Sequence, residues 1–241
     1  MQRYWIWREL QQKGAALRIF LRSRRWPFTR KDMTLGEVFA RVYQTNFWGS
    51  PDSRSGAGSD LIQTAEIRKR IPEVIGDLGA RTMLDIPCGD FHWMKEVELN
   101  VEYIGADVVE DLMRRNQELF STPLRRFIVC DITKGPVPTV DLVLCRDLLV
   151  HLSYQDAFAA LRNLRLSGSK YLLTTTFTER SRNFDIPTTG KWRPLNLELE
   201  PFKFGEPLLL VNEKCTEGDG AWSDKSLGLW RIADLRLAEL R

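Results

Sequence analysis

Residues 82–91, TMLDIPCGDF, decide the fold of this chain. A short apolar run ends at Asp85, and the turn that follows contains Pro87 and Gly89. This pattern predicts a buried strand over 82–86 that presents a carboxylate at its C-terminal end, because Gly89 lets the backbone approach a ligand closely. Two further apolar runs downstream also end in an acid, at Asp107 and Asp131.

The three acids are separated by 22 and 24 residues. One Asp at a strand end more often caps a turn, but three at consecutive strand ends indicate a shared site, because ligands of open α/β sheets bind at the carboxyl ends of the strands. Asp85 suits a cationic amine, Asp107 the two hydroxyls of a ribose, and Asp131 an exocyclic amine. These are the polar groups of S-adenosylmethionine, which we expect as the cofactor.

Short apolar runs alternate with helical patterns over the middle of the chain. The strands are expected at 82–86, 102–107, 126–131, 141–145 and 171–177, and the helices at 91–97, 109–120 and 154–166. Such alternation predicts a doubly wound α/β fold with a mostly parallel sheet covered on both faces. Two last strands, 207–211 and 226–232, lack an intervening helix and predict a terminal hairpin. The expected sheet therefore has seven strands, and its last strand is antiparallel.

Four segments resemble the cofactor motifs of class I S-adenosylmethionine-dependent methyltransferases: LDIPCGD (84–90), YIGADVVEDLMRRN (103–116), FIVCDIT (127–133) and DLVLCRDLLVHLS (141–153). The resemblance runs from about residue 50 to the C-terminus and implies the Rossmann-like fold of that family. It implies the methionine end of the cofactor at Asp85 and Gly89, the ribose at Asp107 beside Val108, and the adenine at Asp131 and Ile132.

The first loop departs from the family pattern D-x-G-x-G-x-G. Pro87 and Phe91 stand where the pattern has glycines, so we expect a different backbone path, with Pro87 in the site and with contacts from Asp90 and Trp93 that other members make elsewhere. The preceding loop, SRSGAGS (53–59), offers backbone amides at Ser55 and Gly56 for the methionine carboxylate, and Arg54 can pair with the same group. The alternative is a plain linker.

A helix is expected from an N-cap at Ser59 or Asp60 through residue 78. Arg146 follows the fourth strand and is a candidate for contact with the cofactor carboxylate or the methyl acceptor; a solvated surface arginine is the alternative. His151 lies near the same strand end and is the candidate general base, since histidine titrates near neutral pH. If the segment is helical, Asp147 lies one turn before His151 and orients its ring. Alternatively, His151 only packs or caps the turn.

The irregular segment 178–205 is the candidate acceptor wall, because long ordered loops are usually functional. Its donors, acceptors and flat aromatic face suit a polar acceptor such as a sugar or an anionic small molecule, with Arg182, Asn183, Asp185, Trp192 and Arg193 as the binding residues. The alternative is a loop that folds over its own sheet.

The N-terminal part is expected as a basic helical segment, residues 1–45, ahead of a methyltransferase domain over 46–241. Residues 1–31 carry nine Lys or Arg and one Glu, hence +8, whereas the whole chain carries +3, which leaves −5 for the remainder. Trp7, Leu10, Leu17 and Leu21 share one helical face. This arm suits contact with an anionic membrane surface or packing on its own domain.

The cysteines are scattered, and no apolar stretch is long enough to span a bilayer. Without a CxxC pair, a zinc site is not expected, and the cysteine pattern fits a reducing compartment. No short apolar core with a small-residue cleavage site is present. We therefore expect a cytoplasmic protein without a metal. Association with a membrane through the basic arm is compatible with this expectation.

The expected activity is methyl transfer from S-adenosylmethionine to a small polar molecule or glycan. The alternative is a non-catalytic protein that has this fold and only binds a partner. An NAD-dependent oxidoreductase is disfavoured because the first turn lacks GxGxxG and Asp85 would face a pyrophosphate. Nucleic acid is disfavoured as a partner because the body of the chain is acidic. The sequence predicts no oligomeric state.

Overall fold

The computed structural model describes residues 33–186 and 188–236. Its centre is a seven-stranded sheet with the order β3-β2-β1-β4-β5-β7-β6. The strands are β1 (Thr82–Asp85), β2 (Glu102–Asp107), β3 (Arg125–Val129), β4 (Leu142–Cys145), β5 (Tyr171–Phe177), β6 (Leu209–Asn212) and β7 (Lys225–Arg231). β7 is antiparallel to both of its neighbours, β5 and β6, whereas the pairs β1–β2, β1–β4, β2–β3 and β4–β5 are parallel. The predicted sheet is confirmed.

The strand order reverses beside β1. From β1 the chain builds outward through β2 and β3, and it then returns to place β4 on the other side of β1. Such a reversal opens a crevice at the carboxyl ends of the central strands, because the connections leave in opposite directions. Asp85 and Asp107, the last residues of β1 and β2, lie at this crevice.

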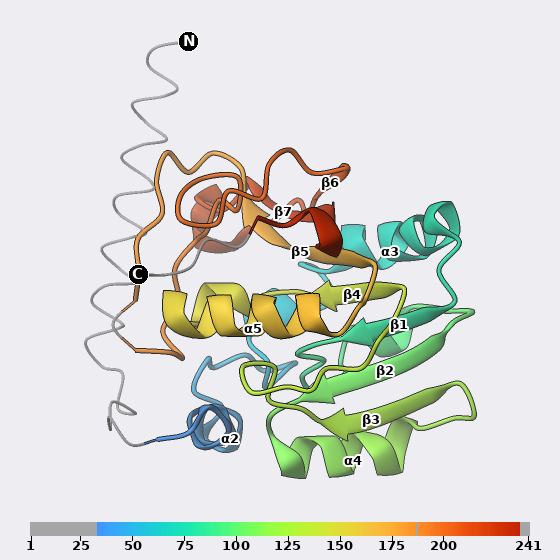
Figure 1. Ribbon diagram of the computed structural model, residues 1–241. Helices are drawn as coiled ribbons and strands as arrows, with labels where there is room; N and C mark the ends of the chain where they lie inside the picture. Colours follow the sequence, from blue (N-terminus) through green and yellow to red (C-terminus); the bar gives the residue numbers. More distant parts are fainter. Residues whose placement is uncertain (1–32, 187, 237–241) are drawn as a thin grey trace.

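Helices and loops cover both faces of the sheet (Figure 1). α3 (Ala65–Leu78) and α4 (Glu110–Phe120) bury their apolar stripes in one core cluster. α5 (Tyr154–Leu166) buries Phe158 and Leu161 in the cluster on the other face. α2 (Leu35–Thr45) begins with a capping box between Thr34 and Glu37, which satisfies backbone donors at its first turn.

Two predicted helices differ in the structure. The segment 91–97 contains only a short 3₁₀ turn, Met94–Glu96, because Phe91 adopts a left-handed φ of 59° and turns its ring into the core. The helix predicted to begin at Ser59 or Asp60 begins at Ala65 instead. Asp60 accepts a hydrogen bond from the Gln63 backbone within a preceding turn, so its carboxylate caps that turn and not the helix.

The irregular segment after β5 packs over the face that α5 covers. Leu195, Leu197, Phe202 and Phe204 of this segment are buried in the same cluster as α5, and Phe202 stacks on Phe158 with ring centroids 5.2 Å apart. This part of the segment therefore completes the core, which agrees with the alternative prediction of a loop that folds over its own sheet.

Within the described residues, no helix is long and apolar enough to cross a membrane, and no group of three His, Cys, Asp or Glu side chains is arranged to hold a metal ion. The four cysteines are buried and free. The helical face predicted for Trp7, Leu10, Leu17 and Leu21 lies outside the described residues.

Candidate functional site

A cavity opens at the carboxyl ends of β1, β2 and β4, and we call it the strand-end cavity. Asp85 and Asp107 form part of its floor, and Phe39, Val42 and Tyr43 of α2 form an apolar wall. Thus α2, which was expected to precede the domain boundary at 45/46, lines the same cavity as the strand ends.

Asp85 is almost completely buried and accepts a hydrogen bond of 2.6 Å from the Tyr103 hydroxyl. Burial raises the pKa of Asp85 from 3.8 to about 7, because a charge is costly away from water. A cationic ligand would stabilise the charged form of this carboxyl strongly, because the ligand's charge replaces the hydration that the carboxylate lost on burial.

Asp107 is held by two backbone donors, the N–H groups of Gly89 at 3.3 Å and Val109 at 3.1 Å. Burial raises the pKa of Asp107 to about 6. Because both bonds come from the turns that follow β1 and β2, Asp107 ties together the two loops that form the floor of the cavity.

The loop over residues 53–55 is fastened to the first turn by Asp90. The Asp90 carboxylate accepts bonds from the Ser53 hydroxyl at 3.0 Å, the Arg54 backbone at 2.9 Å and the Ser55 hydroxyl at 3.2 Å. Gly89, with φ of +54°, leaves room for this contact, since a Cβ there would collide with Ser55 Oγ. Asp90 therefore positions this loop, which lines the cavity opposite the strand ends.

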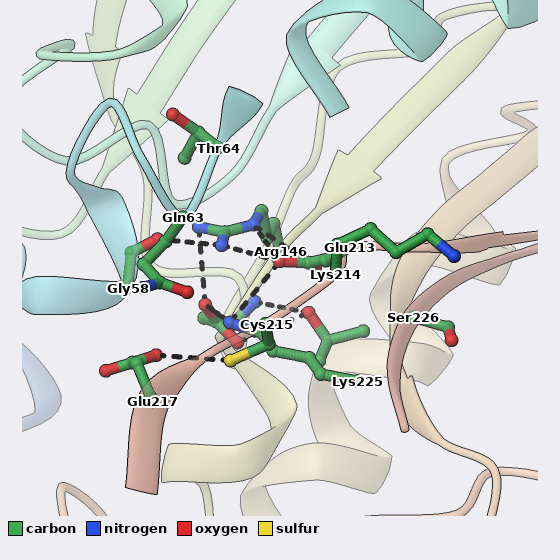
Figure 2. A network of polar contacts seen from close by, with 12 residues as sticks. Gly58, Gln63, Thr64, Arg146, Glu213, Lys214, Cys215, Glu217, Lys225 and Ser226 are labelled. Atoms are coloured by element: carbon green, nitrogen blue, oxygen red, sulfur yellow. Dashed lines mark hydrogen bonds and ion pairs between the residues drawn. The ribbon is translucent and has the colours of Figure 1, made fainter. Parts of the chain in front are cut away.

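A buried ion network contacts the continuation of this loop at Gly58 (Figure 2). The Arg146 guanidinium donates to the Gly58 carbonyl at 2.8 Å and pairs with Glu213 at 2.7 Å. Lys225 pairs with Asp147 at 2.6 Å and with Glu213 at 3.5 Å. Arg146 is thus committed to protein partners, and it joins the loop to the ends of β4 and β6.

His151 borders the strand-end cavity and is held in one tautomer. Its Nδ1 lies 3.0 Å from the Lys191 carbonyl oxygen, so Nδ1 carries the proton and donates it. Nε2 has no hydrogen-bond partner among the described residues. The ring packs 5.1 Å from the Trp48 ring, and burial lowers its pKa to about 4. His151 is therefore neutral at pH 7, with an available lone pair on Nε2.

Asp147 does not orient the His151 ring as predicted. The segment has no helical turn at this point, because Asp147 has a left-handed φ of 56° and only Leu149–His151 form a 3₁₀ turn. Burial alone would raise the pKa of Asp147, but the positive charges of Lys225 and Arg146 lower this pKa to about 2. The carbonyl of Lys191 performs the orienting role.

A second cavity joins the first at His151, and we call it the aromatic cavity. Trp48, Ser55, Ser59, Asp147 and His151 line both cavities. The far wall is a cluster of Phe177, Trp192 and Trp222, in which the Trp192 and Trp222 ring centroids are 4.9 Å apart. Two adjoining cavities with His151 between them can hold two reactants in contact.

No protein-family model matches this chain, and no curated protein matches its sequence. Its fold is similar to solved structures. The methyltransferase domain of bacterial-CtHen1-CN matches with a TM-score of 0.52 at 13% identity, over 71% of this chain and 100% of that chain. Human N-acetylserotonin methyltransferase, in complex with SAM, matches with a TM-score of 0.51 at 12% identity, over 90% of this chain and 66% of that one. The chain has the class I methyltransferase fold.

Within this methyltransferase fold, most residues predicted for the cofactor do line the strand-end cavity. They are Arg54, Ser55, Asp85, Pro87, Gly89, Asp90, Trp93, Asp107, Val108, Ile132 and Arg146. Asp131 does not line it, because its carboxylate accepts from the Thr133 hydroxyl and pairs with Lys134 at 3.1 Å. Gly56 lines the aromatic cavity instead.

The residues predicted for the acceptor are mostly engaged in holding the fold. Trp192 lines the aromatic cavity. Arg193 is fully buried and donates to the Phe184 and Leu149 carbonyls. Asn183 and Asp185 bond to neighbouring backbone groups, and Arg182 is exposed. The structure brings only Trp192 of this group to the cavity.

Sequence reasoning missed several aromatic residues of the candidate site. Phe39 and Tyr43 lie four residues apart on α2, so the apolar stripe of that predicted helix was the available signal. Trp48, Phe177 and Trp222 come from three separate segments, and no local pattern relates them. Glu213 was also missed, because a single acid after a short strand carries no sequence signature.

Proposed function

We propose that this chain is an S-adenosylmethionine-dependent methyltransferase that acts on a small polar molecule. The observation that carries the proposal is the pair of buried carboxylates, Asp85 and Asp107, at adjacent strand ends in a cavity that adjoins a second one at His151. The match to the human enzyme, whose structure contains SAM, supports the same assignment.

The lining of the strand-end cavity fits the chemistry of this cofactor. The buried Asp85 carboxyl gains from a cationic amine, and Asp107 offers a carboxylate for the ribose hydroxyls. Leu112 and Ile132 offer apolar contacts for a flat base. S-adenosylmethionine, when bound, supplies a methyl group on a positively charged sulfur, which prefers a site without excess positive charge.

The residues at the junction of the cavities suit methyl transfer. Positioning two reactants supplies much of the catalysis in a displacement of this kind. His151 Nε2 can accept a proton from an acceptor group that must lose one, and the Lys191 carbonyl keeps the ring in the tautomer that leaves Nε2 free. The aromatic cavity then holds the acceptor, with Trp192 as a flat wall.

Calorimetric titration of the purified chain with S-adenosylmethionine and, separately, with NADH tests the proposal. We expect micromolar binding of S-adenosylmethionine, none of NADH, and loss of binding in Asp107→Ala. The matched control is Asp111→Ala, since Asp111 lies on α4 with an exposed side chain. A folded wild-type protein that binds NADH but no S-adenosylmethionine would refute the proposal in favour of an oxidoreductase.

A further inference from the structure

We infer that the methyl acceptor is an amine attached to a flat apolar body, and that Glu217 holds its cationic nitrogen in the aromatic cavity. The inference rests on the proposed function, because it names the substrate class of that same site. Three observations carry it: the aromatic walls of the cavity, an acidic side chain that forms no ion pair among the described residues, and the proton acceptor at the junction with the strand-end cavity.

The aromatic walls are fixed in place by their own packing. The Phe177 ring lies 5.8 Å from Trp192 and 6.1 Å from Trp222, both in edge-on arrangements. The Arg180 guanidinium covers one face of Trp222 at 5.5 Å and is anchored by Asp224. Rigid indole and phenyl rings bind flat apolar groups and attract cations to their faces.

Glu217 contributes a charge that the network does not balance. Arg146 and Lys225 are paired with Glu213 and Asp147, two cations with two anions. Glu217 lines the cavity and forms no ion pair with any residue in 33–186 or 188–236. The Cys215 thiol donates a weak hydrogen bond to Glu217 Oε2 at 3.8 Å. A partly buried carboxylate in this position is stabilised when a ligand brings a positive charge.

Glu217 lies where the aromatic cavity meets Gly58 and the buried ion network. A Cβ on Gly58 would stand 3.2 Å from Glu217 Oε2, 3.5 Å from Asp147 Oδ2 and 3.6 Å from Lys225 Nζ, so the glycine lets two carboxylates and one ammonium group lie close to its backbone, with one negative charge in excess. Burial raises the pKa of Glu217, and the charges of Lys225 and Arg146 lower it only in part, since neither cation forms an ion pair with it among the described residues. Lys191 also lines the cavity, but its long stem lets its ammonium group reach water.

The chemistry of an amine acceptor balances with the groups present. The bound ammonium loses one proton, to His151 Nε2 or to water, and so exposes the nitrogen lone pair. The nitrogen then forms a bond to the methyl carbon as the sulfur–methyl bond breaks, and the electron pair of that bond stays on sulfur. The products are a methylated ammonium ion, a neutral thioether and the released proton.

Calorimetry on the full chain saturated with S-adenosylhomocysteine tests the inference with two matched pairs of probes, tryptamine with tryptophol and benzylamine with benzyl alcohol. We expect each amine to bind about tenfold more tightly than its alcohol. Glu217→Gln should remove this preference and leave the affinity for S-adenosylhomocysteine unchanged. Lys191→Gln should keep the preference, because it removes a like charge, and so should Glu206→Gln, which alters an exposed acid outside both cavities.

A further variant, Trp192→Leu, should weaken the binding of the amine and of the alcohol in each pair alike, since it removes the flat wall but no charge. Binding of S-adenosylhomocysteine without an amine preference in the wild type, or a preference that survives Glu217→Gln, would overturn the inference alone. A wild-type protein that does not bind S-adenosylhomocysteine would overturn the proposed function together with the inference.

Discussion

Asp85 combines a cost in stability with its proposed role in binding the cofactor. Its pKa is 3.8 in water and about 7 in the folded protein, so the folded state binds a proton that the unfolded state has released. The contribution of this group to stability is complete below pH 4 and is lost as the pH rises to about 7, which amounts to about 4 kcal/mol. A cationic ligand offsets this cost because it pairs with the ionised form.

Asp85→Asn should therefore be more stable than the wild type at pH 8, and its advantage should shrink toward pH 4. The same variant should bind S-adenosylmethionine at least tenfold more weakly, because a neutral amide cannot pair with the amine. Thermal unfolding at several pH values and calorimetry measure the two effects. Equal melting temperatures of variant and wild type across this pH range would contradict the buried, proton-binding state of Asp85.

His151 should remain neutral down to about pH 5, because burial lowers its pKa to about 4. The proton should reside on Nδ1, which faces the Lys191 carbonyl. Nitrogen-15 NMR of the two imidazole rings distinguishes the tautomers and follows their charge with pH, and His151→Gln assigns the signals. A His151 titration midpoint above pH 6 would contradict a buried neutral ring.

The loop over residues 53–59 is an element held by a few polar contacts. Asp90→Ala should release it, since the three donors from Ser53, Arg54 and Ser55 lose their acceptor. Because binding must then order the residues that are released, at about 1 kcal/mol or more for each of them, the affinity for S-adenosylmethionine should fall at least tenfold. Asp52→Ala is the control, because this exposed acid directly precedes the loop. Hydrogen exchange at 53–59 that is unchanged in Asp90→Ala would contradict the clamp.

The buried network joins strand ends that are distant in sequence. Glu213→Gln should destabilise the protein by about 3–5 kcal/mol, because Arg146 keeps its charge in the interior without its closest partner. Glu73→Gln breaks an exposed pair with Arg70 and should cost less than about 1 kcal/mol. Urea unfolding at pH 7 compares them. Similar small losses in both variants would show that Arg146 finds compensation elsewhere.

At the scale of the whole molecule, α2 and the sheet build one cavity although the predicted domain boundary separates them. A chain that begins at residue 46 should lose the wall formed by Phe39, Val42 and Tyr43, and its affinity for S-adenosylmethionine should fall at least tenfold because that apolar contact is lost. Calorimetry on a second chain, which begins at residue 33, measures the same affinity and separates the contribution of α2 from that of the first 32 residues. Equal affinity in the 46–241 chain would support the predicted boundary.

The sheet could be predicted because each strand carries its own signal. The bounds of β2, β5 and α5 agree with the predicted ranges, since their apolar periodicity is local and strong. The helix predicted at 91–97 was wrong because its apolar residues, Phe91, Trp93 and Met94, are buried around a left-handed turn and not along one helical face. Tertiary packing overrode the local pattern there.

The sequence by itself determined the doubly wound type of sheet, its antiparallel last strand and the carboxylates at the ends of β1 and β2. Each of these follows from local patterns, because the apolar run of a strand fixes where the strand ends and which side chain reaches the crevice. Only the tertiary structure decided that Asp131 turns to Thr133, that Arg146 pairs with Glu213, and that the Lys191 carbonyl holds His151. These outcomes depend on distances between segments far apart in the chain, and such distances arise only when the packed core brings those segments together.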